Sequence, residues 1–207
     1  VAPYLDSGSR FCGKSILVPT DMPPVEIDTP EDWVMAELFA KTQDRPAVSK
    51  ANAIKAVVTD FDGVHTDDKV TLNQAGDEFV RCSRADGMGI EMLREKGFRL
   101  LILSREQNAI VKARAKKLKM EVQHHVLNKL PALDAWRTLN GLAWSEIAYI
   151  GNDINDVECM THCGLSFSPC DAHSSARSTA DIVLTKAGGN GAIREMSDYL
   201  LNTGPTT

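Results

Sequence analysis

The sequence lacks several patterns that would assign it to a common functional class. No apolar stretch approaches the length of a membrane-spanning helix, and no signal-peptide pattern opens the chain. The formal net charge is -5, so the basic surplus typical of nucleic-acid binders is missing. Neither a Walker lysine loop nor a dinucleotide-binding glycine pattern occurs, which disfavours a pure nucleotide-binding module. We therefore expect neither a membrane nor a nucleic acid as a partner.

The cysteines show neither an even number nor a repeating spacing. Reduced thiols in a cytoplasmic protein are the simplest interpretation of these five residues, Cys12, Cys82, Cys159, Cys163 and Cys170. Cys159, His162 and Cys163 lie close together and raise the alternative of a zinc site. No second pair with zinc-finger spacing follows them, so helix packing is the preferred interpretation.

The chain divides into two parts of different amino-acid composition. Residues 1–50 are rich in Pro, Ser and Gly, and residues 43–49 read as a linker. One helix is predicted in this part, with Thr29 as N-cap, Pro30 at its first position and Phe39 near its end. We therefore predict an N-terminal piece over residues 1–50 and a main domain over residues 51–207.

Strand-like and helix-like runs alternate through the main domain. This order predicts an α/β fold with a mainly parallel sheet and helices on both faces. The predicted strands are residues 54–59, 99–103, 122–126, 147–150, 165–167 and 181–184. Between Asp67 and Arg84 the alternation is interrupted by a predicted β-hairpin, with strands over 69–72 and 78–80.

Two carboxylates follow the first predicted strand directly. Asp60 and Asp62 leave the strand on the same side because side chains alternate along it. The carboxyl end of a buried parallel strand is where open α/β sheets bind their ligands. A close pair of carboxylates requires a cation to offset its charge, and oxygen ligands favour magnesium. The alternative is a strand that ends in a solvated turn, in which Asp and Gly are common.

Polar residues also follow the later strands. Ser104 precedes a helix whose free amides could cradle a phosphate group, although a plain N-cap is the alternative. Lys129 is at the start of another predicted helix. It is either a ligand of a phosphoryl group or a lysine that faces solvent. The run from Gly151 to Asp156 offers amide and carboxylate oxygens that could bind a cation. The alternative is that Asp153 and Asp156 stabilise the first turn of a helix.

These motifs in this order resemble the haloacid dehalogenase (HAD) superfamily of phosphohydrolases, from Ile54 to about Leu201. The resemblance implies a three-layer, Rossmann-like fold with the hairpin in place of a cap domain. The hairpin, the run from Asp86 to Ile90 and the run from Gly188 to Glu195 are similar to one branch of that superfamily. This branch contains phosphatases for 3-deoxy-manno-octulosonate 8-phosphate and for sialic-acid-type 9-phosphates. Its members are typically homotetramers in which a neighbouring subunit covers the site.

The resemblance implies a role for each candidate residue. Asp60 is the expected nucleophile that forms an aspartyl-phosphate, and Asp62 is the expected general acid and base. The remaining roles are phosphate binding by Gly63, Ser104 and Lys129, Mg²⁺ binding by Asp60, Asp62, Asn152 and Asp153, support of the metal ligands by Asp156, and substrate contact by Arg84, Asp86 and Arg105.

The chain departs from the family pattern at three positions. Asn152 stands where the family usually has a metal-binding carboxylate, which removes one charge. Ala85 stands where a basic residue often precedes Asp-Gly, and Arg84 is the candidate substitute. His65 replaces a small apolar residue, and we expect a partly exposed turn histidine there rather than a substrate contact.

The N-terminal piece carries a second resemblance. The run from Pro24 to Glu37 is similar to the tail of an N-acylneuraminate cytidylyltransferase, but the Gly-rich, basic nucleotide-binding portion of that family is missing. We therefore expect a C-terminal fragment of a fusion of the two enzymes. The alternative function is a non-catalytic or weakly active module that oligomerises such a cytidylyltransferase. A phosphotransferase is disfavoured because the hairpin is too short to exclude water as a cap would.

Overall fold

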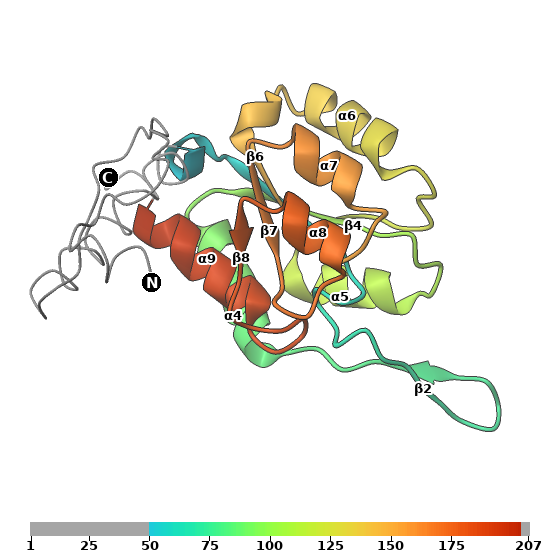
Figure 1. Cartoon of the computed structure of the whole chain (residues 1–207). Coiled ribbons are helices and arrows are strands. Elements are labelled where there is room, and N and C mark those ends of the chain that lie inside the picture. Colours follow the sequence, from blue (N-terminus) through green and yellow to red (C-terminus); the bar gives the residue numbers. More distant parts are fainter. Residues whose placement is uncertain (1–49, 204–207) are drawn as a thin grey trace, which may run out of the picture. The chain divides into compact units, whose positions relative to one another are not determined.

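The computed structural model describes residues 50–203, and a six-stranded parallel sheet forms its centre (Figure 1). The strand order is β5-β4-β1-β6-β7-β8, and every neighbouring pair is parallel. The strands are β1 (Ala56–Thr59), β4 (Arg99–Leu103), β5 (Glu121–Gln123), β6 (Ile147–Ile150), β7 (Leu165–Ser168) and β8 (Ile182–Val183). The predicted α/β class and the mainly parallel sheet are confirmed.

Helices cover both faces of this sheet (Figure 1). The first group consists of α4 (Arg84–Glu95), α5 (Ile110–Leu118) and α9 (Ala192–Thr203), whose apolar residues share one core with Val57, Ile102 and Ile150 of the strands. The second consists of α6 (Lys129–Leu139), α7 (Val157–His162) and α8 (Ser174–Thr179), whose apolar residues pack on the other face. Because successive strand residues point to opposite faces, the continuous apolar runs supply both cores. The predicted three-layer arrangement is confirmed.

A hairpin projects from the domain after β1, as predicted (Figure 1). It consists of β2 (Thr71–Leu72) and β3 (Glu78–Phe79), which pair antiparallel. Asn73 closes the turn by accepting from the amides of Ala75 and Asp77. The side chain of Asn108 donates to Glu78 at 3.1 Å and ties the hairpin to the loop before α5. No helix within residues 50–203 has the length and hydropathy needed to cross a membrane.

Two predicted features differ from the structure or lie outside it. β5 ends at Gln123 rather than at the predicted Val126, because His125 adopts a left-handed conformation with φ 59° that ends the extended backbone. The helix predicted from Thr29 to Phe39 and the rest of residues 1–49 lie outside the described residues.

Cys159 and Cys163 are buried in the core that α7 shares with the sheet. Burial raises the pKa of the Cys159 thiol to about 12 and raises the pKa of the Cys163 thiol as well, so both thiols stay protonated. Their position agrees with the preferred interpretation of helix packing.

Candidate active site

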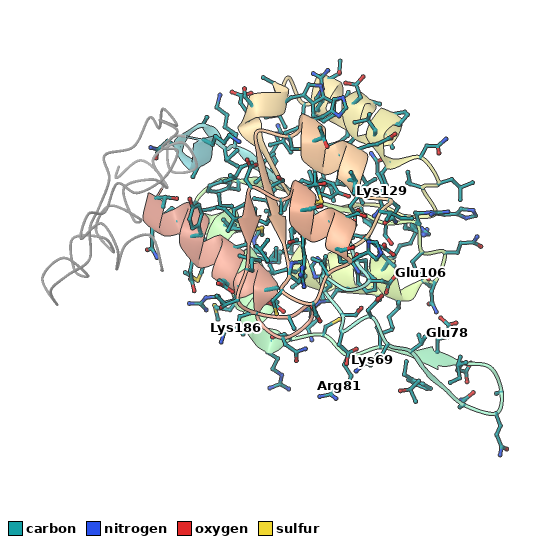
Figure 2. All side chains as sticks on the ribbon, in the orientation of Figure 1. Lys69, Glu78, Arg81, Glu106, Lys129 and Lys186 are labelled. Carbon is teal, nitrogen blue, oxygen red and sulfur yellow. The ribbon has the colours of Figure 1, made fainter. Side chains whose placement is uncertain are left out.

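The polar residues that follow the strands meet in one crevice at the carboxyl edge of the sheet. β1 leads into Asp60, β4 leads into Ser104, and β6 leads into the turn that begins at Gly151. The crevice encloses about 100 Å³ and is lined by Asp60, Asp62, Asp68, Ser104, Arg105, Glu106, Asn152, Asp153 and Asn155. Figure 2 marks Glu106 and Lys129 on the side of the domain from which the hairpin projects. Residues from three separate loops are thus brought together.

Lys129 joins two buried carboxylates beneath this crevice. Its ammonium nitrogen lies 2.8 Å from Oδ1 of Asp60 and 2.6 Å from Oδ1 of Asp156. Asp60 Oδ1 also accepts from the amide of Phe61 at 2.7 Å. Asp156 accepts from the Tyr149 hydroxyl at 2.7 Å and from the amides of Asn152 and Asp153. The two carboxylates therefore have fixed positions, and Asp156 supports the turn that carries Asn152 and Asp153.

Burial makes the largest contribution to the pKa values of Asp60 and Lys129. It raises the pKa of Asp60 to about 8, with a further contribution from Asp156, and the attraction of Lys129 opposes both. Burial by itself lowers the pKa of Lys129, but the two carboxylates outweigh it and the pKa is raised overall. The ammonium is therefore charged at neutral pH, whereas the negative charge on Asp60 requires a further cation for full stabilisation.

Asp62 is half-buried and also lines the crevice. Burial, followed by the nearby charges of Glu106 and Asp68, raises its pKa to about 6. A carboxyl group in this range holds a proton near neutral pH more readily than an exposed aspartate and can also release it. Asp62 is thus electrostatically suited to act as acid and base.

Gly63 shapes the loop that holds both aspartates. Its φ of 69° is left-handed, and a Cβ at this position would lie 1.9 Å from Nδ2 of Asn152. Its amide donates to Oγ1 of Thr66 at 3.2 Å. Only glycine therefore lets the loop approach Asn152 this closely, and in this structure the amide predicted to bind phosphate is engaged within the loop.

Ser104 and Arg105 both line the crevice. The buried hydroxyl of Ser104 accepts from the amide of Glu106 at 3.0 Å. This bond closes a turn and is not a helix cap, because α5 begins only at Ile110 with Ala109 as its N-cap. The same hydroxyl can still donate a hydrogen bond to an anion.

The turn after β6 offers oxygen atoms to a cation. Asn152, Asp153 and Asn155 line the same crevice as Asp60, and no residue between 50 and 203 forms a hydrogen bond with the buried Oδ1 of Asn155. Within residues 50–203, no three carboxylate, imidazole or thiol groups converge as a metal site by themselves. Amide and carbonyl oxygens would therefore complete the coordination shell. Such an all-oxygen set fits Mg²⁺ rather than Zn²⁺.

The structure corrects the prediction for Asp86. The carboxylate is buried outside the crevice and accepts from the amides of Gly191 at 3.2 Å and Arg194 at 2.9 Å. It therefore caps the start of α9 rather than contacting substrate. Arg84 is the exposed first residue of α4 and does not line the crevice.

His65 is also different from the expectation of a partly exposed residue. The imidazole is fully buried, lies 2.8 Å from Oγ1 of Thr59 through Nε2, and stacks on Phe61 with 5.7 Å between ring centroids. Burial lowers the pKa of His65 to about 3, so the ring is neutral. It packs behind the strand end that carries Asp60.

Sequence reasoning missed several residues that complete this region. Asp68, Glu106 and Asn155 line the crevice, and Tyr149 supports Asp156 from within β6. Asn155 belonged to the predicted cation-binding turn and could have been included on that ground. The other three carry no local pattern that distinguishes them from surface or core residues.

Comparisons with known proteins agree with this geometry. A family described as haloacid dehalogenase-like hydrolase matches residues 95–196. A 3-deoxy-D-manno-octulosonate 8-phosphate phosphatase of Haemophilus influenzae is 35% identical over 73% of this chain and 85% of its own length. The structure of such a phosphatase from Moraxella catarrhalis, in complex with magnesium, phosphate and the sugar acid, is 31% identical with a TM-score of 0.75, over 78% of this chain and 92% of that one.

A second group of relatives is longer than this chain. N-acylneuraminate cytidylyltransferase A of Danio rerio is 31% identical over 86% of the chain, which spans only 42% of that protein. The chain thus corresponds to less than half of these relatives but to most of a complete octulosonate phosphatase. It therefore belongs to the haloacid dehalogenase-like hydrolases.

Proposed function

We propose that this chain is a Mg²⁺-dependent phosphohydrolase that removes phosphate from a sugar-acid phosphate. The substrate class is a 2-keto-3-deoxy octulosonate 8-phosphate or nonulosonate 9-phosphate. The observation that carries this proposal is the placement of Asp60, pinned by Lys129, in one crevice with Asp62, Ser104 and Asn152. The similarity to octulosonate phosphatases supports the substrate class.

Hydrolysis proceeds in two steps on these residues. Asp60 attacks phosphorus, an oxygen–phosphorus bond forms, and the bond to the sugar oxygen breaks as Asp62 donates its proton to that oxygen. Asp62 then takes a proton from the water that attacks the aspartyl-phosphate, which releases phosphate and restores Asp60. Both contacts described above fall on Oδ1 of Asp60, so we assign Oδ2 to the attack.

The other residues of the site bind the metal ion and the phosphate group. The carboxylate of Asp60, the backbone carbonyl of Asp62, Asn152 and Asp153 would hold Mg²⁺, with Asp156 holding the turn in place. When bound, this ion offsets the repulsion between the phosphate group and the carboxylates. Ser104, Lys129 and the loop at Gly63 bind the transferring oxygens.

A phosphate-release screen tests this proposal. With Mg²⁺, we expect turnover of octulosonate 8-phosphate or nonulosonate 9-phosphate, and we expect EDTA to abolish it because the carboxylates then lack their cation. The measurement is free phosphate at fixed enzyme concentration, with 4-nitrophenyl phosphate as a small general substrate. A folded protein that releases phosphate from none of these would contradict the proposal.

A silent screen would favour the alternative of an oligomerisation module attached to a cytidylyltransferase. The observation behind this alternative is the match to less than half of the cytidylyltransferases, together with the loss of one carboxylate at Asn152. We propose that residues 1–50 are the tail of such a domain and that the chain is part of a fusion. The intact pair of Asp60 and Asp62 beside Lys129 supports the catalytic proposal.

The hairpin supports a proposal of a homotetramer. Its apolar side chains are exposed: the exposed fraction is 55% for Val70, 63% for Leu72 and 56% for Phe79. Leu127 and Ile154, which precede α6 and α7, are also exposed. Exposed apolar residues on a protruding strand pair favour contact with another chain. We propose that the hairpin of one copy covers the crevice of a neighbour.

The change of Leu72 and Phe79 to serine should dissociate the tetramer, because it removes the apolar contact without touching the core. Light scattering after size-exclusion chromatography should give four chains for the unmodified protein and fewer for this variant. Leu139→Ser, at a position that is 85% exposed on α6, is the matched control and should leave the mass unchanged. An unmodified protein that elutes as a monomer would refute the arrangement.

A further inference from the structure

A second cavity lies beside the catalytic crevice. It encloses about 300 Å³ and is lined by Asp67, Arg81, Cys82, Ser83, Gly189 and Asn190. These residues come from the loop after β1, from the segment between β3 and α4, and from the loop before α9. Neither the proposed hydrolysis nor the metal site uses any of them.

Consecutive residues of one loop line the two cavities. Asp68 lines the catalytic crevice, and Asp67 lines the second cavity. The loop of Gly188 and Gly189 packs directly on the catalytic loop: the Gly189 amide donates to Val64 at 2.9 Å, and a Cβ on Gly188 would lie 2.0 Å from the carbonyl oxygen of Gly63. A substrate bound in the crevice therefore has this cavity as its neighbour.

The cavity lies on the side of Asp62, the proposed acid. Oγ1 of Thr66 accepts from the amides of Gly63 and Asp68, so the loop folds the residue after Asp62 against the residue after Asp67. Burial raises the pKa of the Cys82 thiol, Arg114 lowers it, and the charges of Asp86, Asp62 and Asp67 raise it further. Since Asp62 donates its proton to the oxygen of the leaving group, the leaving group must lie next to Asp62. The organic part of the substrate is therefore directed toward the cavity that Cys82 lines.

The lining of the cavity suits an acidic polyol. Arg81 is its single basic side chain and has no hydrogen bond or ion pair within the described part of the chain. Ser83 is the N-cap of α4, and its hydroxyl accepts from the amides of Ala85 and Asp86. Asp67 and Asn190 offer acceptors and a donor for hydroxyl groups. Figure 2 marks Arg81 near the base of the hairpin.

We propose that this cavity binds the carboxylate end of the substrate and that Arg81 is the residue that selects acids over neutral sugar phosphates. A guanidinium group can contact both oxygens of a carboxylate at once, which a neutral side chain cannot do. This inference rests on the proposed function, because it requires a phosphate group in the neighbouring crevice to fix the position of the substrate.

The test compares Arg81→Gln with the unmodified enzyme on a matched pair of substrates. The pair is octulosonate 8-phosphate and its methyl ester, which lacks the negative charge, with 4-nitrophenyl phosphate as a substrate that leaves the cavity empty. For Arg81→Gln we expect kcat/KM to fall about 10- to 100-fold on the acid, mainly through KM, and less than about twofold on the other two. Lys117→Gln, an exposed lysine of α5, is the charge-matched control.

Three outcomes would overturn the inference. The first is an equal loss on all three substrates, which would place Arg81 in the phosphate chemistry or in the fold. The second is no loss on the acid, and the third is a selective loss in Arg84→Gln but not in Arg81→Gln. Calorimetric binding of the free octulosonate to both proteins gives a readout without turnover, and we expect about 10-fold weaker binding by Arg81→Gln. An enzyme that hydrolyses nothing but binds the acid through Arg81 would refute the hydrolase proposal alone.

Discussion

Replacement of Asp60 by asparagine is expected to lower phosphate release by about 10³-fold or more, because an amide cannot attack phosphorus and form the acyl-phosphate. The fold should survive. The amide oxygen of the new side chain can still accept from Lys129 and from the Phe61 amide, and Lys129 keeps its contact with Asp156. The measurement is kcat on the preferred sugar-acid phosphate, with circular dichroism to confirm folding.

Asp134→Asn is the matched control for this experiment. Asp134 is an exposed carboxylate on α6 whose ion pair with Arg137 lies far from the catalytic loop in sequence, so kcat should be unchanged. Asp62→Asn separates the two chemical roles. This variant keeps the nucleophile and should accumulate a phosphorylated enzyme on an activated ester, since the water that releases phosphate then lacks its base. Activity of Asp60→Asn above about a tenth of the original would exclude Asp60 as nucleophile.

Replacement of Lys129 by methionine is expected to cost about 3–5 kcal/mol in the free energy of unfolding and to abolish activity. Lys129 is buried between Asp60 and Asp156, and its removal leaves two carboxylates close together in a region of low polarity. Urea unfolding at about pH 7.5, where an ordinary carboxyl group is ionised, measures this loss. Lys55→Met, which removes an exposed partner of Glu146, is the control and should change the unfolding midpoint little.

The loss in Lys129→Met should depend on pH. Without the ammonium, the folded-state pKa of Asp60 stays above the ordinary value of 3.8, because burial and the nearby charge of Asp156 still raise it while the opposing attraction of Lys129 is lost. A raised carboxyl pKa favours the protonated folded state, so stability is retained at low pH and lost as pH rises through the folded-state pKa. The destabilisation should therefore be smaller at about pH 5 than at about pH 8. A loss that is equal at both values would show that cavity formation, not charge, is responsible.

The positions of the residues that we propose for catalysis could be predicted because the topology of a parallel sheet brings them together. Asp60, Ser104 and Asn152 each follow a run that is apolar enough to form a buried strand, and parallel strands place their carboxyl ends at one edge. The resemblance then supplied their roles. No long-range geometry was needed for this part of the prediction.

Residues whose partners are distant in the chain could not be assigned in this way. Asp86 accepts from the amide of Arg194, and nothing in the sequence around Asp86 distinguishes this capping role from substrate binding. His65 is polar, and its burial depends on stacking with Phe61 and on the hydroxyl of Thr59. In both cases the local sequence is compatible with exposure, and tertiary packing decides the environment.

The loop at Gly188 and Gly189 has a consequence for how the enzyme is made. Its backbone packs on the loop that carries Asp60 and Asp62, although the two loops are far apart in the sequence. Asp86 in turn accepts a hydrogen bond from the segment that leads into α9. During synthesis, all of the residues that we propose for catalysis leave the ribosome before Gly188 and Gly189 do. A nascent chain thus carries a complete set of reactive side chains but lacks their final support, and competence arrives only once α9 has been synthesised.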